Sequence, residues 1–506
     1  MQADQLFIVP DMIRANAKKQ PEKTALAQDN DQLTYIEFDR QVDAVAAGLQ
    51  HAGLVPEDTI ALCGLNSISY AVLFVGALRA GVAAALIAPS STAEGIKAMV
   101  RDSGAKILFI DKTLTDTAPE LSDVEIPAFS LDLEGIKTFA AAAPNTPQPV
   151  ELNPKWAFNI IYSSGTTGAP KGIVQSHEMR SGHVDRAGTG FGYTPDAVTM
   201  IATPLYSNTT LVSFIPALAL GGTIVLMGKF DAATFLGLAE KHRATHTMLV
   251  PVQYKRIMDV PNFGDYNLSS FQAKFCTSAP FSGTLKADIL ARWPGGLVEF
   301  YGMTEGGGTC ILVAHQHPDK LDTVGVPAEG HDIRLIDDDG VEVSRGKMGE
   351  IVGASEVMME GYKGLPEKTR EAEWHDKSGK RFIRTGDIGR FDEDGFLTLM
   401  DRKKDMIISG GFNIYPSDLE AELLKHSAVS DAAVVGVPSE DWGETPVAYI
   451  VPTGGIEPEA DIIKSWLAER VGKTQRLHDV VFTNELPRSA IGKILKRELR
   501  DSYAAL

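Results

Sequence analysis

From about residue 59 the chain alternates short apolar runs with amphipathic stretches of helical period. Thr59–Cys63, Val82–Ala88 and Lys106–Asp111 are typical of buried strands, and helical segments near Ser69–Arg79 and Ala93–Asp102 separate them. Strands that alternate with helices favour parallel sheets covered by helices on both faces. The pattern therefore predicts an α/β fold.

The same alternation returns farther along the chain. Trp156–Tyr162 is one further apolar run, and the later predicted strands are Val198–Thr203, Thr223–Met227, Thr247–Val250, Lys274–Thr277 and Leu297–Phe300. Between about residues 118 and 154 the pattern weakens and prolines accumulate. Proline cannot donate to a strand ladder, so we expect an irregular connection there.

Beyond about residue 323 the texture changes to short strands and Asp/Gly turns such as Asp337-Asp338-Asp339-Gly340, which predict a small β-rich subdomain. The last hundred residues have an α+β pattern of their own, with predicted helices Ser417–Lys425, Ala460–Val471 and Gly492–Tyr503 and predicted strands Asp431–Val437, Val447–Val451 and Val480–Thr483. We expect a large N-terminal domain of parallel-rich sheets layered with helices, including the β-rich subdomain, at 1–400. A hinge at 401–405 and a small mobile α+β C-terminal domain at 406–506 would follow.

Composition restricts the class of protein. The 506 residues are 44% hydrophobic and 23% charged, which is ordinary for a soluble globular chain. The net charge of -18 argues against nucleic acid or an anionic membrane as a partner. Neither a basic leader nor an apolar run of membrane-spanning length occurs. We expect a cytoplasmic protein with no integral membrane segment, either a monomer or a homodimer.

Cys63, Cys276 and Cys310 are odd in number and far apart. They lack CxxC or Cys/His spacing, so the sequence supports neither a disulfide framework nor a zinc site. A reducing compartment fits this pattern best.

One stretch carries candidate chemistry, the run Ser163-Ser164-Gly165-Thr166-Thr167-Gly168-Ala169-Pro170-Lys171-Gly172. Its glycines let backbone N–H groups turn toward an anion, its hydroxyls add donors, and its lysine adds positive charge. It lacks the Gly-Lys-Ser/Thr of a P-loop. The run predicts a polyphosphate cradle, and a flexible surface linker is the alternative.

Four further motifs follow along the chain: Thr277-Ser278-Ala279-Pro280, Tyr301-Gly302-Met303-Thr304-Glu305, Thr385-Gly386-Asp387 and Leu486-Pro487-Arg488-Ser489-Ala490-Ile491-Gly492-Lys493. With the glycine-rich run they resemble the adenylate-forming superfamily, which comprises acyl-CoA synthetases, firefly luciferases and peptide-synthetase adenylation domains. The resemblance spans Leu33 to Lys493, and it is strongest to a stand-alone acyl- or aryl-CoA ligase.

The resemblance implies a nucleotide site. Its ATP- or AMP-binding residues would be Ser163, Ser164, Gly165, Thr166, Thr167, Gly168, Lys171, Ser278, Ala279, Pro280, Tyr301, Gly302, Asp387 and Arg402. Thr304 would hold the α-phosphate and Glu305 would ligate Mg²⁺, a role that suits a hard carboxylate oxygen. Asp387 would accept hydrogen bonds from the ribose hydroxyls.

The resemblance also implies two half-reactions, in which ATP activates a carboxylic acid to acyl-AMP and the thiol of coenzyme A then displaces AMP. Lys493 would be the catalytic lysine that bridges the acid and the α-phosphate, and Lys404 the hinge residue. The coenzyme A contacts would come from Gly410, Gly411, Phe412, Trp442 and Arg476. Trp442 has an equal alternative as a core tryptophan.

The acid pocket would be lined by Tyr206, Ser207, Thr210, Thr277, Gly306 and Gly307. Ser207 stands where the family ordinarily has an aromatic residue or a histidine, so the pocket is expected to be roomy and somewhat polar. An aromatic or medium-chain acid is favoured.

Three other functions compete with acyl- or aryl-CoA ligation: loading of a separate carrier protein, synthesis of long-chain fatty acyl-CoA, and non-catalytic nucleotide binding. No carrier domain follows Lys493, which favours coenzyme A as the acceptor. The presence of Lys171, Thr304, Glu305 and Asp387 disfavours a non-catalytic module.

Overall fold

The computed structural model describes residues 8–144, 146–163, 171–356, 358–402, 405–409, 412–439, 442–455, 458–472, 475–489 and 492–504. The chain divides into two compact units. The first contains Met1–Leu321, Pro327–Asp332 and Ala354–Ile383, and the second contains Asp322–Val326, Ile333–Gly353 and Arg384–Leu506. The second unit thus takes in the β-rich stretch together with the C-terminal residues, and the hinge at 401–405 stays a prediction.

One sheet of the first unit has the strand order β14-β13-β12-β11-β9-β10-β1-β2. Its strands are β1 (Thr24–Gln28), β2 (Asp31–Thr34), β9 (Val198–Ile201), β10 (Thr223–Leu226), β11 (His246–Leu249), β12 (Ala273–Cys276), β13 (Gly296–Gly302) and β14 (Thr309–Val313). Neighbouring strands are parallel except at the two ends of this run, where β1 pairs antiparallel with β2 and β13 with β14. The β13–β14 hairpin carries the segment Tyr301–Glu305.

The second sheet of this unit has the order β18-β8-β7-β4-β3-β5-β6. Its strands are β3 (Thr59–Cys63), β4 (Ala83–Ile87), β5 (Ala105–Ile110), β6 (Ala128–Ser130), β7 (Ala157–Ser163), β8 (Lys171–Ser176) and β18 (Gly361–Tyr362). Every residue of β3 and β4 is buried, as continuous apolar runs in a parallel sheet require. The glycine-rich run therefore joins two neighbouring antiparallel strands, β7 and β8.

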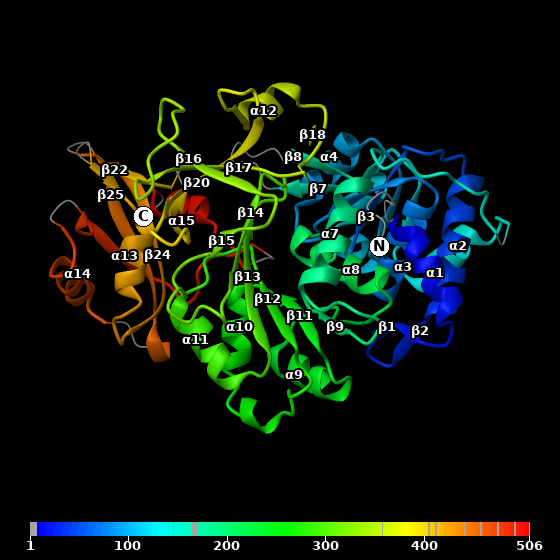
Figure 1. Ribbon diagram of the computed structural model, residues 1–506, viewed down its shortest axis with the longest axis horizontal. Helices are drawn as coiled ribbons and strands as arrows, with labels where there is room; N and C mark the ends of the chain where they lie inside the picture. Colours follow the sequence, from blue (N-terminus) through cyan, green and yellow to red (C-terminus); the bar gives the residue numbers. More distant parts are fainter. Residues whose placement is uncertain are drawn as a thin grey trace. The chain divides into compact units, whose positions relative to one another are not determined.

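Helices accompany both sheets (Figure 1). They are α1 (Val9–Lys19), α2 (Tyr35–His51), α3 (Ile68–Arg79), α4 (Ala93–Ser103), α5 (Lys112–Thr117), α6 (Leu133–Ala140), α7 (His177–Gly190), α8 (Asn208–Ala219), α9 (Ala232–Lys241), α10 (Pro251–Met258), α11 (Gly283–Arg292) and α12 (Pro366–Glu371). Short 3₁₀ turns occur at η1 (Pro119–Asp123) and η2 (Phe263–Asp265). Helix α2 begins with a capping box, in which Thr34 N–H donates to Glu37 and Glu37 N–H donates to the Thr34 hydroxyl.

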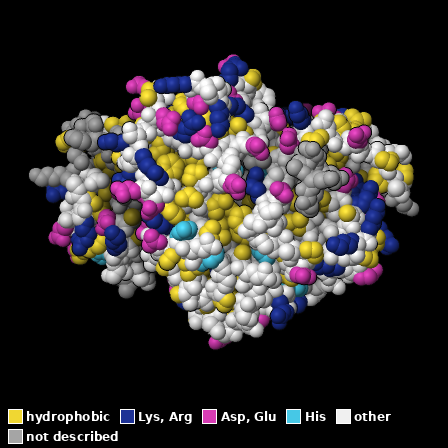
Figure 2. Space-filling model, in the orientation of Figure 1, with side chains coloured by type: hydrophobic (Ala, Val, Ile, Leu, Met, Phe, Trp, Pro, Cys, Tyr) yellow, Lys and Arg dark blue, Asp and Glu magenta, His cyan; other side chains and the backbone are white. Residues whose placement is uncertain are grey.

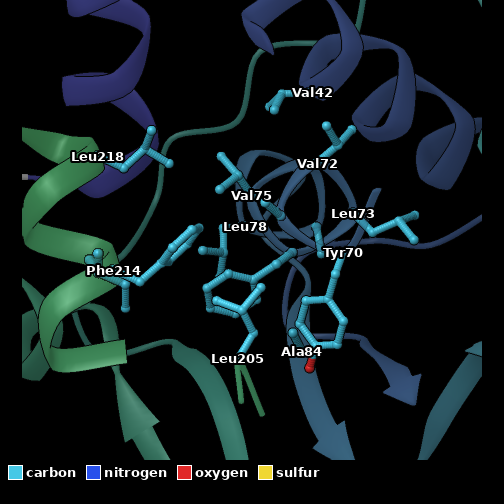
Figure 3. Close-up of a cluster of buried hydrophobic side chains, with 14 of the residues drawn as sticks. Val42, Tyr70, Val72, Leu73, Val75, Leu78, Ala84, Leu205, Phe214 and Leu218 are labelled. Atoms are coloured by element: carbon cyan, nitrogen blue, oxygen red, sulfur yellow. The ribbon is translucent and has the colours of Figure 1, made fainter. Parts of the chain in front are cut away.

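The core of the first unit forms where α3 packs against α2 and α8. Figure 3 shows Val75 and Leu78 of α3 beside Phe214 and Leu218 of α8. Helices α2 and α3 approach closely at Gly76, because a Cβ there would lie 2.5 Å from Cγ1 of Val45. A larger residue at this position would force the two helices apart.

The second unit contains the β-rich stretch and a small α/β sandwich. Its remaining strands and helices are β16 (Asp332–Ile336), β17 (Gly349–Ala354), β20 (Arg381–Phe391), β21 (Leu397–Arg402), β22 (Ile407–Ser409), β23 (Phe412–Ile414), β24 (Val429–Ser439), β25 (Gly443–Pro452), β26 (Asp479–Phe482), α13 (Pro416–Leu423), η3 (Thr453–Gly455), α14 (Ala460–Ala468) and α15 (Lys496–Tyr503). The chain passes between the units within β15 (Val326–Pro327), β16, β17 and β20, and β19 (Glu373–His375) belongs to the first unit. Alternate residues of β24 enter two apolar clusters, Val434 on one face and Val435 on the other.

The predicted α/β class and the organisation of the sheets are confirmed. Two details were wrong. The stretch expected to be irregular contains β6, which adds a strand to the second sheet, and α6. The last helix begins at Lys496 instead of Gly492, because Gly492 has a φ of +75°, outside the helical region, and Ile494 then pairs with Arg488 in an isolated β-bridge.

Cys63, Cys276 and Cys310 are buried and free. Within the described ranges, no helix is both long and apolar enough to cross a membrane. Figure 2 shows basic and acidic side chains interspersed on the face that it presents.

A buried ion pair joins α11 to β13, the first strand of the β13–β14 hairpin. Lys286 Nζ of α11 is 2.5 Å from Glu299 Oε2 of β13, and the two side chains are 1% and 6% exposed. Burial raises the pKa of Glu299 to about 7, and the Lys286 charge acts in the opposite direction. Removal of the lysine would leave a buried carboxylate with no compensating charge.

We expect Lys286→Met to lower the free energy of unfolding by about 3 kcal/mol at about pH 8. Without the lysine the Glu299 pKa in the folded state rises further above its unfolded value. Such a group stabilises the fold at low pH and loses that contribution as pH rises through the folded pKa. The destabilisation should therefore shrink at about pH 6, which urea unfolding at both pH values would measure.

Lys255→Met is the control, because it breaks an ion pair with Asp259 whose side chains are more than half exposed. It should cost less than about 1 kcal/mol at either pH. An equal loss for both variants, or a loss for Lys286→Met that does not depend on pH, would contradict the prediction.

Candidate active site

Three side chains of the first unit form a chain of contacts. Tyr362 of β18 donates its hydroxyl to Glu305 Oε1 at 2.8 Å, and Lys171 Nζ lies 5.0 Å from the centre of the Tyr362 ring. Burial, and next the charge of Glu305, raise the pKa of Tyr362 well above its usual range. The phenol therefore stays protonated and holds the carboxylate while its ring faces the ammonium group.

Strand pairing sets this arrangement. Strand β18 lies antiparallel to β8, with Tyr362 opposite Ile173, and the N–H of Lys363 donates to the carbonyl of Gly172. The N–H of Met359 donates to the carbonyl of Glu305 at 2.8 Å. Met359 thus fixes the backbone of Glu305, and Tyr362 of β18 fixes its carboxylate. Tyr362 was absent from the sequence prediction, since no motif marks a two-residue strand.

A buried polar network holds the backbone of Thr304. Gln175 Nε2 donates to the Thr304 carbonyl at 2.8 Å, while Gln175 Oε1 accepts from Asn159 Nδ2 at 2.9 Å and from the Arg180 guanidinium. Arg180 Nε donates to Asn159 Oδ1 at 3.0 Å. Burial lowers the pKa of Arg180 to about 9, so it remains cationic at neutral pH. The network links β7, β8 and α7 to the Thr304 segment.

The glycines after Glu305 make the hairpin turn. Gly306 and Gly308 have φ values of +75° and +93°, which favour glycine. The N–H of Gly308 donates to the carbonyl of Gly306, and Ser355 Oγ donates to the same carbonyl at 2.8 Å. The backbone alone therefore explains Gly306, and the pocket-lining role of Gly306 and Gly307 stays a prediction.

The segment beside the predicted adenine site has a strained backbone. Ser278 has a φ of +83°, and its hydroxyl is 2.5 Å from the Thr209 hydroxyl. Residues other than glycine in this region cost energy and often occur at functional sites. The contact joins the segment after β12 to the start of α8. That segment, which directly follows Cys276, contains Thr277, Ser278, Ala279 and Pro280.

Asn66 holds the start of the predicted acid-pocket segment through hydrogen bonds to the backbone. Its Nδ2 donates to the carbonyls of Thr203 and Met227, and its Oδ1 accepts from the N–H of Leu205. Tyr206 follows and is half-buried, and Ser207 is the N-cap residue of α8. The Thr210 hydroxyl lies 2.5 Å from the Pro204 carbonyl and 2.8 Å from the Thr203 hydroxyl. Asn66 is a positioning residue that sequence reasoning missed.

In the second unit, Asp387 and Arg402 are register partners on β20 and β21. The N–H of Asp387 donates to the Thr385 hydroxyl at 3.0 Å, and that hydroxyl donates to the Ile351 carbonyl at 2.9 Å. Gly386 has a φ of +72°, which turns the backbone between them.

Lys493 lies in a turn that precedes α15. The N–H of Ser489 donates to the Lys493 carbonyl at 2.8 Å, and the N–H of Lys493 approaches the Ser489 hydroxyl at 3.2 Å. Arg488 fixes the turn, because its guanidinium donates to the Gly492 carbonyl and to Asp431 of β24. Lys493 therefore lies in a turn that Arg488 holds, whereas the predicted helix Gly492–Tyr503 would have included it.

The coenzyme A candidates differ in exposure. Trp442 is 59% exposed, which excludes the alternative of a core tryptophan. Arg476 is also exposed.

Several predicted residues lie outside the described part of the chain. They are Ser164, Gly165, Thr166, Thr167 and Gly168 of the glycine-rich run, the hinge residue Lys404, and Gly410 and Gly411. The side chains of Ser163, Arg402 and Phe412 lie outside it as well.

Comparison with known proteins identifies the family. The model of the AMP-binding enzyme family matches residues 13–363, and that of the AMP-binding enzyme C-terminal domain matches residues 418–493. The chain therefore belongs to the AMP-binding enzyme family, which confirms the resemblance inferred from its motifs.

Curated relatives match along nearly their whole length. The chain is 33% identical to a feruloyl-CoA synthase from Amycolatopsis sp, covering 96% of this chain and 97% of the relative. It is 32% identical to 4-coumarate--CoA ligase 2 from Nicotiana tabacum, covering 93% and 90%.

Two solved structures match the fold over nearly the whole chain. ATP-bound MatB from Rhodopseudomonas palustris has a TM-score of 0.88 at 28% identity, and the amide bond synthetase McbA from Marinactinospora thermotolerans has a TM-score of 0.86 at 27% identity. Each match covers 98% of this chain and 99% of the other.

The strained Ser278 gives a stability test. Ser278→Ala and Ser278→Gly both lose the contact with the Thr209 hydroxyl, but only glycine adopts the positive φ without strain. We expect Ser278→Gly to be more stable than Ser278→Ala by about 1 kcal/mol in urea unfolding.

Ser465, an exposed residue within α14, is the control because its backbone is helical. There the order should reverse, with glycine less stable than alanine by about 1 kcal/mol. The same order at both positions would contradict a strained backbone at Ser278.

Proposed function

We propose that this member of the AMP-binding enzyme family is an ATP-dependent ligase that joins an aromatic carboxylic acid to coenzyme A through an acyl-adenylate. The contact chain from Lys171 through Tyr362 to Glu305 supports the proposal, because a cation and an oriented carboxylate share one tyrosine. The feruloyl- and 4-coumaroyl-type relatives, which match over most of this chain, support an aromatic acid.

In the first half-reaction, a carboxylate oxygen of the acid forms a bond to the α-phosphorus of ATP. The bond from that phosphorus to the bridging oxygen breaks, and pyrophosphate leaves with the electron pair. The acid is already ionised at neutral pH, so no general base is required. The reaction is slowed by the repulsion between the carboxylate and ATP, which are both anions. We propose that two lysines offset this repulsion: Lys171 at the pyrophosphate, and Lys493 between the acid and the α-phosphate.

Glu305 fits a magnesium site. Tyr362 holds Oε1, and we propose Oε2 as the oxygen that meets the metal. Among the described residues no cluster of three or more metal-binding side chains occurs. Such a site suits Mg²⁺, which takes one or two carboxylates and completes its shell with phosphates and water. When bound, the ion would neutralise charge on the phosphates.

We assign the nucleoside to three elements. Asp387 would accept from the ribose hydroxyls, and its register partner Arg402 would contact the ribose or the phosphate. The backbone at Ser278, Ala279 and Pro280 would lie along the adenine. The strain at Ser278 supports this assignment, because it is maintained by a hydrogen bond to α8.

In the second half-reaction, the sulfur of coenzyme A attacks the acyl carbon, and the bond from that carbon to the AMP oxygen breaks. We propose that the C-terminal domain at 406–506 rearranges about the hinge at 401–405 for this step. The exposure of Trp442 and Arg476 supports their role toward coenzyme A. Gly410, Gly411 and Phe412 would allow close approach of the thiol arm.

A panel of acids tests the function. Pyrophosphate release would be measured with benzoates, hydroxycinnamates, medium-chain and long-chain fatty acids, each with and without coenzyme A. We expect the aromatic acids to give the highest kcat/KM and coenzyme A to yield an acyl thioester. Preference for fatty acids would contradict the proposal of an aromatic acid as the substrate. Transfer only to a carrier protein or to an amine would contradict the acceptor.

Lys493 should matter for one half-reaction only. We expect Lys493→Ala to lower the rate of pyrophosphate release at least about 100-fold, because it removes the charge between two anions. Thioester formation from supplied acyl-AMP should stay within about threefold of the unmodified enzyme, since that step no longer joins two anions. Stopped-flow or quench measurements of each half-reaction would separate the two.

Lys425→Ala is the matched control, because it removes an exposed lysine that pairs with Glu422 in the same unit. It should leave both half-reactions unchanged. Equal loss of both half-reactions in Lys493→Ala would refute the assigned role.

A further inference from the structure

One tyrosine lies between the cation and the carboxylate of the candidate active site. The Tyr362 hydroxyl donates to Glu305 Oε1 at 2.8 Å, and Lys171 Nζ lies 5.0 Å from the centre of the same ring. All three side chains are half-buried, so a ligand can reach them. Among the described residues, this ring is the one partner of the Lys171 ammonium group. Within that part of the chain, Lys171 and Glu305 therefore communicate through Tyr362.

Strand pairing and helix α12 hold the tyrosine in place. Strand β18 lies beside β8 (Figure 1), with Tyr362 opposite Ile173. Side chains two residues apart on a strand share a face, so Lys171 is the diagonal neighbour of Tyr362 across this pair. The N–H of Tyr362 donates to the Thr369 hydroxyl of α12 at 3.0 Å. The ring also packs against the buried side chains of Ile173 and Met359, so its position does not depend on a ligand.

The two contacts of Tyr362 strengthen one another. A phenol that donates to a carboxylate forms a charge-assisted hydrogen bond, which shifts electron density toward the ring. An electron-rich ring face attracts an ammonium group more strongly. A divalent cation at Glu305 would draw charge from the carboxylate and weaken the hydrogen bond from Tyr362. The ring would then hold Lys171 less tightly.

We infer that Tyr362 is a positioning residue that couples Lys171 to Glu305, so that occupation of Glu305 by a divalent cation frees Lys171 to bind the triphosphate. The inference rests on the proposed function and concerns the order within the same site. Coupling of this kind is reciprocal, so a triphosphate that draws Lys171 off the ring also favours the cation at Glu305. A tyrosine that only orients Glu305 would have no effect through the lysine.

The test measures the dissociation constant of ATP by titration calorimetry in the absence of any acid, once with EDTA and once with saturating Mg²⁺. The ratio of the two constants reports how far Mg²⁺ strengthens nucleotide binding. We expect Tyr362→Phe, which keeps a ring and loses the donor, to lower this ratio about threefold. Lys171→Met should lower it by a similar factor, because the lysine that would be freed is absent.

The double variant separates coupling from simple orientation of Glu305. If Tyr362 acts through Lys171, Tyr362→Phe combined with Lys171→Met should have the same ratio as either single variant, within about twofold. If the tyrosine only orients Glu305, the two factors multiply, and the ratio falls about ninefold below that of the unmodified enzyme. That second result would overturn the inference.

Tyr35→Phe is the control, because its hydroxyl donates to the carbonyls of Leu218 and Gly222, which belong to none of the motifs. It should keep the full ratio. If the unmodified enzyme binds no ATP even with Mg²⁺, the proposed function fails. If it binds ATP and the ratio is unchanged in Tyr362→Phe or in Lys171→Met, only this inference is overturned. Thermal unfolding identifies a misfolded variant, and if Tyr362→Phe does not fold, the ratio in Lys171→Met decides.

Discussion

A buried guanidinium fixes the backbone on which the proposed chemistry depends. Arg180 satisfies Asn159 and Gln175, and Gln175 in turn binds the carbonyl of Thr304. A buried charge is tolerated only when its donors are paired, so the network can adopt few alternative arrangements. The hairpin position of Glu305, the contact with Tyr362 and the course of α7 all depend on this arrangement.

Local cations offset an acidic chain. The net charge of -18 would repel ATP and a carboxylate alike, yet the first unit places Lys171 over the Tyr362 ring. It also places Arg180 against Gln175, which binds the Thr304 carbonyl. The second unit presents Lys493 from a turn anchored by Arg488. The proposed function therefore divides its cations between two units, each anchored by its own hydrogen bonds. Fixed charges of this kind need no reorganisation when charge develops in a reaction.

The sequence predicted what depends on local pattern and ordered motifs. Buried strands such as β3 and β4 are unbroken apolar runs, and Lys171, Thr304 and Glu305 stand in recognisable segments. It missed residues whose role arises from pairing distant in sequence. Tyr362 meets Glu305 only because a two-residue strand pairs with β8, and Asn66 binds backbone groups 137 and 161 residues away. The start of α15 was misplaced because Gly492 adopts a positive φ. Exposure of Trp442 likewise could not be judged from sequence.

Transfer of oxygen from the acid to AMP tests the acyl-adenylate most directly. An aromatic acid labelled with ¹⁸O in both carboxylate positions would be turned over with ATP and coenzyme A, and the AMP and thioester would be analysed by mass spectrometry. An acyl-adenylate predicts one labelled oxygen in AMP and one in the thioester, since the thiol breaks the bond between the acyl carbon and the AMP oxygen. Label in inorganic phosphate, with ADP as the product, or unlabelled AMP would contradict it.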